Sequence, residues 1–142
     1  MAGRVPRSFI DDLLNRQSGL KGICGFNDMR EIYQQSEQGN AAAQRAITMY
    51  CYRIRKYIGA YTAVLGWVDA IVFTAGIGEN AAFIRAQVCE ELGVLGIELD
   101  ATKNKLSCEG VLDIATAESA VRILVIPTDE EWEIAMQTRS LL

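Results

Sequence analysis

The sequence predicts an α/β fold in which two buried strands are flanked by helices on both sides. The strands are short apolar runs at residues 70–73 and 121–126. The first run carries no charge and no alternation, which is typical of a strand covered on both faces. A long amphipathic pattern at residues 41–65 indicates a helix that packs on a sheet or on another helix. No repeat or low-complexity segment interrupts the sequence, so we predict a single domain over residues 1–142.

Composition and charge narrow the class of protein. Half of the residues are apolar and 23% are charged, so the chain can bury a core. The net charge of -4 and the lack of a basic block argue against nucleic acid or an anionic membrane as the main partner. No stretch approaches about 18 uncharged apolar residues, and residues 1–7 lack the apolar core of a signal peptide, so we expect a cytoplasmic protein.

The chain has four cysteines and no histidine. Cys24, Cys51, Cys89 and Cys108 form no C-x-x-C pair, so we expect reduced thiols rather than a zinc site. Cys51 and Cys89 fall within helical patterns and are expected to pack as small apolar residues. Without histidine, any catalysis must rely on carboxylates, cations or a metal.

Helix signals dominate the amino-terminal part. Ser8 is expected to begin a helix that ends near Gly19. The glycine-rich residues 20–25 are expected to form a loop or a short extended piece. Asp28 followed by Glu31 forms a capping-box arrangement, which predicts the start of another helix.

Asn40 is expected to cap the long helix at residues 41–65. Its apolar residues fall on one stripe, which includes Tyr57 and Tyr61. Tyrosines at such spacing are more often core or interface residues than ligand contacts. We therefore expect this stripe to be packed.

The first predicted strand stops at two closely spaced glycines, Gly76 and Gly78. Glycine lets the backbone turn sharply and approach a ligand without a Cβ atom in the way. From Ala81 the pattern becomes helical, so the amino terminus of a helix would direct its free N–H groups at the loop. This stretch therefore predicts an anion site.

The glycine pattern alone leaves alternatives open. Gly76-x-Gly78-x-x-Ala81 also matches the dinucleotide fingerprint G-x-G-x-x-G/A. The apolar residues 94–99 then end on Asp100, about where a ribose-binding acid should fall. A tight strand-to-helix turn with no ligand is a third interpretation.

The carboxyl-terminal part predicts short extended segments and a final helix. In order, we expect a turn and then a short strand or extended segment (93–100), a polar connection (101–106), weak strand character (111–117), the second buried strand (121–126) and a helix (132–140). The apolar face of this helix would include Trp132, Ala135, Met136 and Leu142.

Three carboxylates precede the final helix, in the run Thr128-Asp129-Glu130-Glu131. Acids in a first helical turn are favoured by the helix dipole, which is the usual reason for such a cluster. Magnesium also takes oxygen ligands and often uses only one or two protein carboxylates beside phosphates. Both interpretations stay open from the pattern alone.

The longer sequence pattern around the glycine motif is more specific than the motif itself. The run V-F-T-A-G-I-G-E-N at residues 72–80, followed by Ile84-Arg85 and then Leu95-Gly96-Ile97, closely resembles the adenosine-binding loop of acetate kinases and their propionate and butyrate kinase relatives. Further matches follow in the same order along nearly the whole chain, at residues 14–22, 57–61 and 126–131. Separated matches in one order are far more specific than one glycine motif.

The resemblance implies a ribonuclease H-like fold, as in the acetate and sugar kinase, heat-shock and actin superfamily. The chain would correspond to the carboxyl-terminal third of such a kinase, as an incomplete nucleotide-binding domain. The residues that handle acetate and the transferring phosphoryl group would lie outside it, so no catalytic residue is assigned to this stretch. By itself it would be inactive.

The resemblance also implies roles for residues of this sequence. The adenine nucleotide, ATP or ADP, would be bound by two segments that match the family pattern, Asp28, Met29 and Arg30 in one and Gly76, Ile77, Gly78, Glu79 and Asn80 in the other. Arg30 could stack on a purine or engage a phosphate, although a surface salt bridge would also explain it. Glu130 would serve Mg²⁺, and Glu131 has no assigned role.

The implied function is Mg²⁺-dependent phosphoryl transfer between ATP and acetate, or a similar short carboxylate, in the full enzyme, which is expected to be a homodimer. Two alternatives belong to other classes. One is a dinucleotide-binding module built on residues 76–100. The other is a non-catalytic fragment that contributes only a dimerisation surface.

Overall fold

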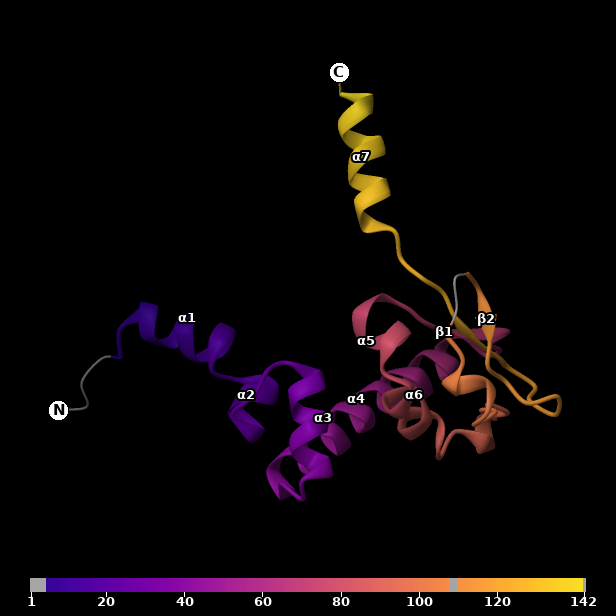
Figure 1. Cartoon of the computed structure of the whole chain (residues 1–142), viewed down its shortest axis with the longest axis horizontal. Coiled ribbons are helices and arrows are strands. Elements are labelled where there is room, and N and C mark those ends of the chain that lie inside the picture. The colour runs from indigo at the N-terminus through magenta and orange to yellow at the C-terminus, as the bar shows by residue number, and fades with distance from the viewer. Residues whose placement is uncertain (1–4, 108–109, 142) are drawn as a thin grey trace. The chain divides into compact units, whose positions relative to one another are not determined.

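A computed structural model describes residues 5–107 and 110–141 of the chain (Figure 1). The chain groups into two compact units, Met1–Lys56 and Tyr57–Leu142, and their boundary falls within the helix α4, Ala41–Leu65. The single domain over residues 1–142 stays a prediction. Within the described residues, no helix combines the length and apolar character that a membrane crossing needs.

The first unit is helical and contains α1, Arg7–Arg16, and α2, Gly19–Cys24. The helix α1 begins after Pro6, because proline fits the start of a helix. It therefore starts one residue before the predicted Ser8. The predicted loop at residues 20–25 is wrong. Gly19 and Gly25 have φ angles of 63° and 86° and lie at the two ends of α2, so the glycines delimit a helix instead of breaking it.

The predicted helix caps at Asp28 and Asn40 are confirmed. The carboxylate of Asp28 accepts a hydrogen bond from the Arg30 amide at the start of α3, Met29–Glu37. The side-chain oxygen of Asn40 accepts from the amides of Ala42 and Ala43, 3.0 and 3.3 Å away, and α4 has the predicted bounds. Capping side chains satisfy amides that the first helical turn leaves unpaired.

The apolar stripe of α4 is buried only in its first half. Ala43, Ile47 and Cys51 are buried. Tyr57 and Tyr61 are 53% and 62% exposed and stack on each other, with ring centroids 6.2 Å apart. The expected packing is therefore confirmed for the amino-terminal half of the stripe, and the two tyrosines lie outside the core.

The second unit contains a three-stranded sheet in the order β1-β3-β2. The strand β1, Ala70–Phe73, pairs in parallel with β3, Arg122–Val125, and Ala70 faces Arg122 in this register. The short strand β2, Leu112–Asp113, pairs antiparallel with the other edge of β3. Both predicted strands are confirmed as strands, and the weak strand character after residue 111 is a two-residue strand. The expected burial of β1 on both faces is wrong: no residue of β1 is buried and Val72 is 52% exposed, because β1 lies at the edge of the sheet.

Residues 93–100 form a turn and then an extended segment. Residues Gly93–Leu95 form the 3-10 turn η1, and Gly96 follows with a φ of 73°, which interrupts an extended chain. Only Leu99 forms a bridge, with Ala115. The predicted turn is confirmed, and the segment after it is extended and pairs through this bridge without forming a full strand. The polar connection that follows contains a second 3-10 turn, η2, Lys103–Lys105.

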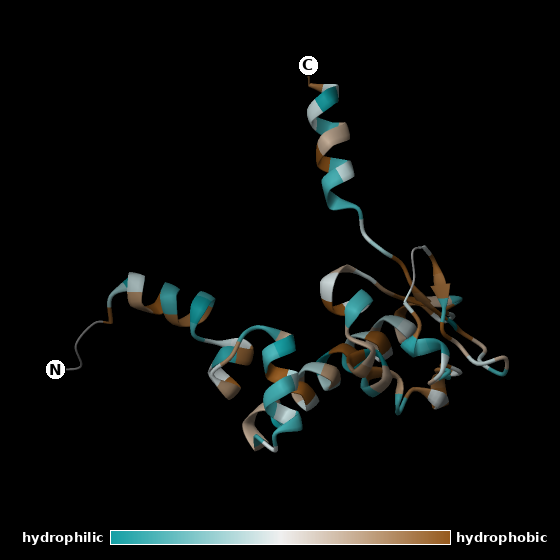
Figure 2. Ribbon diagram, in the orientation of Figure 1, coloured by the Kyte–Doolittle hydropathy of each residue, from teal (hydrophilic) through white to brown (hydrophobic). Residues whose placement is uncertain are grey.

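Three helices complete the second unit. They are α5, Ala75–Asn80, α6, Ala82–Cys89, and α7, Glu130–Ser140. Asp129 caps α7, since its carboxylate accepts from the amide of Trp132 at 2.9 Å, so the helix begins two residues before the predicted start. Every described residue of α7 is exposed, and Figure 2 shows both hydrophobic and hydrophilic colours along it. Its predicted apolar face is not buried, and Leu142 lies outside the described residues.

Candidate functional site

The predicted glycine loop is a short helix. After β1 ends at Phe73, only Thr74 separates the strand from the six-residue helix α5. Ala75 begins this helix with a φ of 56°, the only positive φ at a non-glycine residue in the described chain. Alanine adopts this conformation only where the surrounding structure enforces it. The junction between β1 and α5 is therefore a strained point of the backbone.

The two glycines of α5 have different structural roles. Neither has a positive φ, so the expectation that they make a sharp turn is wrong. A Cβ atom at Gly78 would lie 3.0 Å from the carbonyl carbon of Phe73, which means that Gly78 permits α5 to approach the end of β1. A Cβ atom at Gly76 would meet nothing within 4 Å. Gly76 therefore leaves a stretch of helix backbone open.

The segments that follow β1 and β3 lie side by side. Because the two strands are parallel, their carboxyl ends meet at one edge of the sheet, which is where open α/β sheets bind ligands. The amide of Ile126 donates to the carbonyl of Phe73 at 2.9 Å, and the Thr74 hydroxyl donates to the carbonyl of Ile126 at 2.7 Å. Hydrogen bonds between residues 52 and 53 apart in the chain therefore join the two segments at this edge of the sheet.

Glu79 fixes α5 to the segment that leads into α7. Its carboxylate oxygen Oε1 accepts hydrogen bonds from the amide and the hydroxyl of Thr128, at 2.9 and 3.1 Å. Asn80 instead donates to the carbonyl of Gly76, one turn earlier in the same helix. The structure thus brings the predicted residues 76–80 next to the Thr128 segment, two residues before Glu130.

Glu130 is the first residue of α7 and is exposed. Glu131 and Glu133 lie in the same first turn, where the helix dipole stabilises acidic side chains. The described residues contain no group of three acids, cysteines or histidines arranged to hold a metal. A single exposed carboxylate still fits a magnesium ion that takes its other ligands from phosphates and water. The metal role of Glu130 stays a prediction.

Asp28, Met29 and Arg30 belong to the first unit. The Asp28 carboxylate accepts from the Arg30 amide at 2.8 Å and from its guanidinium at 3.1 and 2.6 Å. The bonds from Arg30 lower the pKa of Asp28 to about 2, and the carboxylate raises the pKa of Arg30. The Arg30 side chain is 92% exposed, whereas Met29 is buried. The guanidinium thus faces solvent, paired with its own helix cap.

Sequence reasoning gave no role to two residues that hold α5. Arg85 of α6 is 3% exposed, and its Nη1 atom donates to the carbonyls of Gly78 and Glu79 at 2.8 and 2.7 Å. Its Nε and Nη2 atoms donate to the side-chain and main-chain oxygens of Asn104, each at 2.7 Å. Burial lowers the pKa of Arg85. An arginine within the apolar pattern of a short helix was the available signal for this contact.

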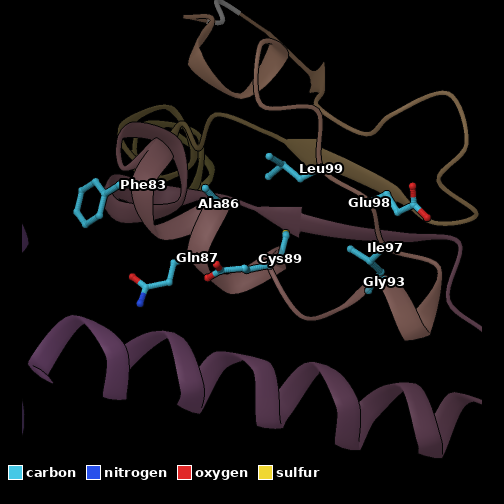
Figure 3. Close-up of a pocket in the computed structure, with 9 residues that line it drawn as sticks. Phe83, Ala86, Gln87, Cys89, Gly93, Ile97, Glu98 and Leu99 are labelled. Atoms are coloured by element: carbon cyan, nitrogen blue, oxygen red, sulfur yellow. The ribbon is translucent and has the colours of Figure 1, made fainter. Parts of the chain in front are cut away.

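A pocket of about 570 Å³ lies between α6 and the segment that follows it (Figure 3). Its lining residues are Phe83, Ala86, Gln87, Cys89, Glu90, Gly93, Ile97, Glu98 and Leu99. None of the residues predicted to bind nucleotide or metal lines this pocket. The pocket is therefore distinct from the edge of the sheet described above.

The described cysteines are free. Cys51 and Cys89 are buried in helices, as predicted, and burial raises their pKa values to about 11 and about 12. Their thiols are thus protonated at neutral pH and act as small apolar side chains. Cys108 lies outside the described residues.

Comparison with known proteins identifies the family. A sequence model of the acetokinase family matches residues 5–136. The chain belongs to the acetokinase family. It is 57% identical over 129 residues to the acetate kinase of Syntrophobacter fumaroxidans, and 54% identical over 132 residues to that of Oleidesulfovibrio alaskensis. These matches cover 91% and 93% of this chain but 31% and 33% of the relatives. The chain therefore spans about a third of their length.

Solved structures of family members have the same fold. The acetate kinase of Porphyromonas gingivalis superimposes with a TM-score of 0.85 at 42% identity and covers 96% of this chain, which corresponds to 34% of that protein. The propionate kinase of Francisella tularensis gives a TM-score of 0.83 at 41% identity, over 92% of this chain and 33% of its own. The predicted α/β fold and the family resemblance are both confirmed.

The dinucleotide alternative is not favoured within this family, and its structural unit is not formed. The parallel neighbour of β1 is β3, while residues 94–99 form no parallel strand beside it. Asp100, the expected ribose-binding acid, accepts hydrogen bonds from the amides of Thr102 and Lys103 at 2.8 and 3.0 Å. Asp100 therefore fixes a turn. A Rossmann unit would instead place this acid at the end of a parallel strand.

Proposed function

We propose that this chain is the nucleotide-binding portion of an acetate kinase. In the full enzyme it would take part in Mg²⁺-dependent phosphoryl transfer between ATP and acetate, or a similar short carboxylate, to give acetyl phosphate and ADP. Support comes from the family membership and from relatives that carry the name acetate kinase. A cytoplasmic homodimer is part of the same proposal and rests on the resemblance alone.

One observation carries the proposed site. The exposed backbone at Gly76 lies beyond the carboxyl end of β1, beside the segment after the parallel strand β3, where ligands bind in open α/β sheets. The adenosine moiety would lie against Gly76 and Ile77, where no Cβ atom of Gly76 stands in the way. Gly78 contributes by letting α5 approach β1, and Glu79 by its bonds to Thr128.

The remaining assignments rest on the resemblance to the family. Asn80 would complete the loop that faces the nucleotide. Asp28, Met29 and Arg30 would contribute through the guanidinium and the backbone, since the Met29 side chain is buried. Glu130 would offer one carboxylate to Mg²⁺, which neutralises phosphate charge when bound. Phosphoryl transfer asks mainly for positioning and charge stabilisation, so a unit without histidine can serve it.

A matched pair of glycine substitutions tests the proposal. Gly76 and Gly59 are both helical, and a Cβ atom at either would meet nothing within 4 Å. Gly76→Val should weaken ADP binding about tenfold or more, which corresponds to about 1.4 kcal/mol, because the side chain would occupy the nucleotide position. Gly59→Val should leave the affinity unchanged. Calorimetric titration of ADP with Mg²⁺ measures both.

Other outcomes would overturn the proposal. If the folded wild-type chain bound no ADP, or if Gly76→Val bound ADP as tightly as Gly59→Val, the site assignment would be rejected. Tighter binding of NADH than of ADP would favour the dinucleotide module. A stable dimer in light scattering, without any nucleotide binding, would favour the dimerisation fragment.

A further inference from the structure

Arg85 is unusual because it is buried and paired with uncharged groups. Its side chain is 3% exposed, and within the described residues its hydrogen bonds are accepted by the carbonyls of Gly78 and Glu79 and by oxygens of Asn104. Arginine is rarely buried so completely without an acidic partner. A surface ion pair therefore does not explain why an arginine occupies this buried position.

The partners of Arg85 lie at the end of α5. Carbonyls in the last turn of a helix lack partners within the helix and carry its negative partial charge, so a cation there is favoured. The planar guanidinium reaches two consecutive carbonyls through one nitrogen, at 2.8 and 2.7 Å. A six-residue helix does not persist by itself in water. Contacts from outside α5 must therefore hold it.

Asn104 gives Arg85 a fixed support. Asn104 is 4% exposed, accepts from Arg85 with both its oxygens, and donates from Nδ2 to the carbonyl of Ala82 at 2.8 Å. Its own amide donates to the carbonyl of Asp100, whose carboxylate fixes the turn. The Asn104 turn thus orients the guanidinium of Arg85 from one side. On its other side the guanidinium donates hydrogen bonds to the carbonyls of α5.

We propose that Arg85, oriented by Asn104, is a positioning residue for the nucleotide site. It holds α5, and with it the open backbone at Gly76, in the geometry that receives the adenosine moiety, without touching the nucleotide. This inference rests on the proposed function, since it assigns a role within the same site. It also predicts that Arg85 protects the backbone of α5 from local opening, which amide exchange can measure without nucleotide.

The test combines local hydrogen exchange with ADP affinity. Arg85→Lys keeps the positive charge but loses the planar fork, so it cannot serve all the acceptors. Amide exchange in residues 75–81 should accelerate about tenfold or more, while exchange in α4 stays unchanged, because local opening no longer has to break the Arg85 contacts. ADP affinity should fall by a similar factor at a temperature where circular dichroism shows the variant fully folded.

Two further variants complete the design. Asn104→Ala removes one acceptor and the bond to Ala82 but leaves Arg85 in place, so it should give a smaller change in the same direction and serves if Arg85→Lys fails to fold. Arg45→Lys, at an exposed arginine of α4, is the matched control and should change neither quantity.

The outcomes separate the two proposals. Unchanged exchange in residues 75–81 of folded Arg85→Lys and Asn104→Ala would overturn the positioning role. So would unchanged ADP affinity in these variants beside a wild-type chain that binds, and this result would leave the proposed function intact. A uniform acceleration over the whole chain would show a purely structural role and overturn the inference. A wild-type chain that binds no ADP would reject the proposed function itself, and the positioning role with it.

Discussion

Two segments of this chain match the nucleotide-binding pattern of the family, and the molecule holds them by different means. The segment at Asp28 and Arg30 is held by bonds between residues two apart, all of them exposed. The helix α5 is held by bonds between residues 49 apart, from Thr128 to Glu79, and by the buried Arg85. The first segment is local, and the second depends on the folded unit.

This difference between local and long-range contacts predicts how substitutions in each segment affect stability. Local exposed pairs contribute little to stability and are screened by salt, so the Arg30 guanidinium is free to exchange its partner for a ligand. The helix α5 includes a strained residue, Ala75, and a close approach at Gly78, both of which the surrounding structure enforces. Substitutions at Gly78 or Ala75 should therefore change stability more than loss of the side-chain pair between Asp28 and Arg30.

The largest effect is expected at Gly78. Gly78→Val should lower the free energy of unfolding by about 1 to 3 kcal/mol, because its side chain would collide with the backbone of Phe73. Gly76→Val is the control two residues earlier and should be close to neutral, since its Cβ atom meets nothing within 4 Å. Urea unfolding measures both. Equal losses at the two glycines would contradict the close approach of α5 to β1.

A smaller effect of opposite sign is expected at Ala75. Ala75→Gly should raise the free energy of unfolding by up to about 1 kcal/mol, because glycine adopts a positive φ without the penalty that alanine has. Ala63→Gly, in the helical backbone of α4, should instead lower it by about 0.5 to 1 kcal/mol. Thermal melting can compare the two. A loss of stability at Ala75 as well would show that the residue is not strained.

The smallest effect concerns the titration of Asp28. Its pKa is lowered from 3.8 to about 2 by the bonds from Arg30, so its contribution to stability is present above pH 3.8 and is lost as the pH falls towards 2. NMR titration of the carboxyl should give a midpoint near 2. Arg30→Gln should move the midpoint upward. A midpoint near 3.8 in the wild type would show that the exposed pair is not formed in solution.

Sequence patterns were most informative where a structure depends on near neighbours. Asp28 and Asn40 are the predicted caps, α4 has the predicted bounds, and the runs at 70–73 and 121–126 form strands. Cap bonds span two or three residues, and an uninterrupted apolar run between turn signals favours a strand, so both features can be recognised in the sequence.

Glycines were interpreted less well. The glycines at residues 20–25 and 76–78 were expected to make loops, yet Gly22 lies inside α2, Gly25 lies at its end, and Gly76 and Gly78 lie inside α5. A glycine can serve a turn, a helix end or a close approach, and the sequence does not separate these roles. The contact between Gly78 and Phe73 appears only when α5 is placed against β1.

The sequence by itself determined the family, the two main strands, the long helix and its cap, because these follow from local composition and from ordered matches along the chain. Only the tertiary structure decided that Arg85 and Asn104 hold α5, that Glu79 binds Thr128, and that Asp100 fixes a turn. Arg85 with Asn104, and Glu79 with Thr128, are pairs of residues distant in sequence. The sequence pattern of Asp100 was equally compatible with a ribose-binding acid in a dinucleotide-binding fold. Folding alone brings such partners together, since hydrogen-bond geometry is set by position in space and not by spacing along the chain.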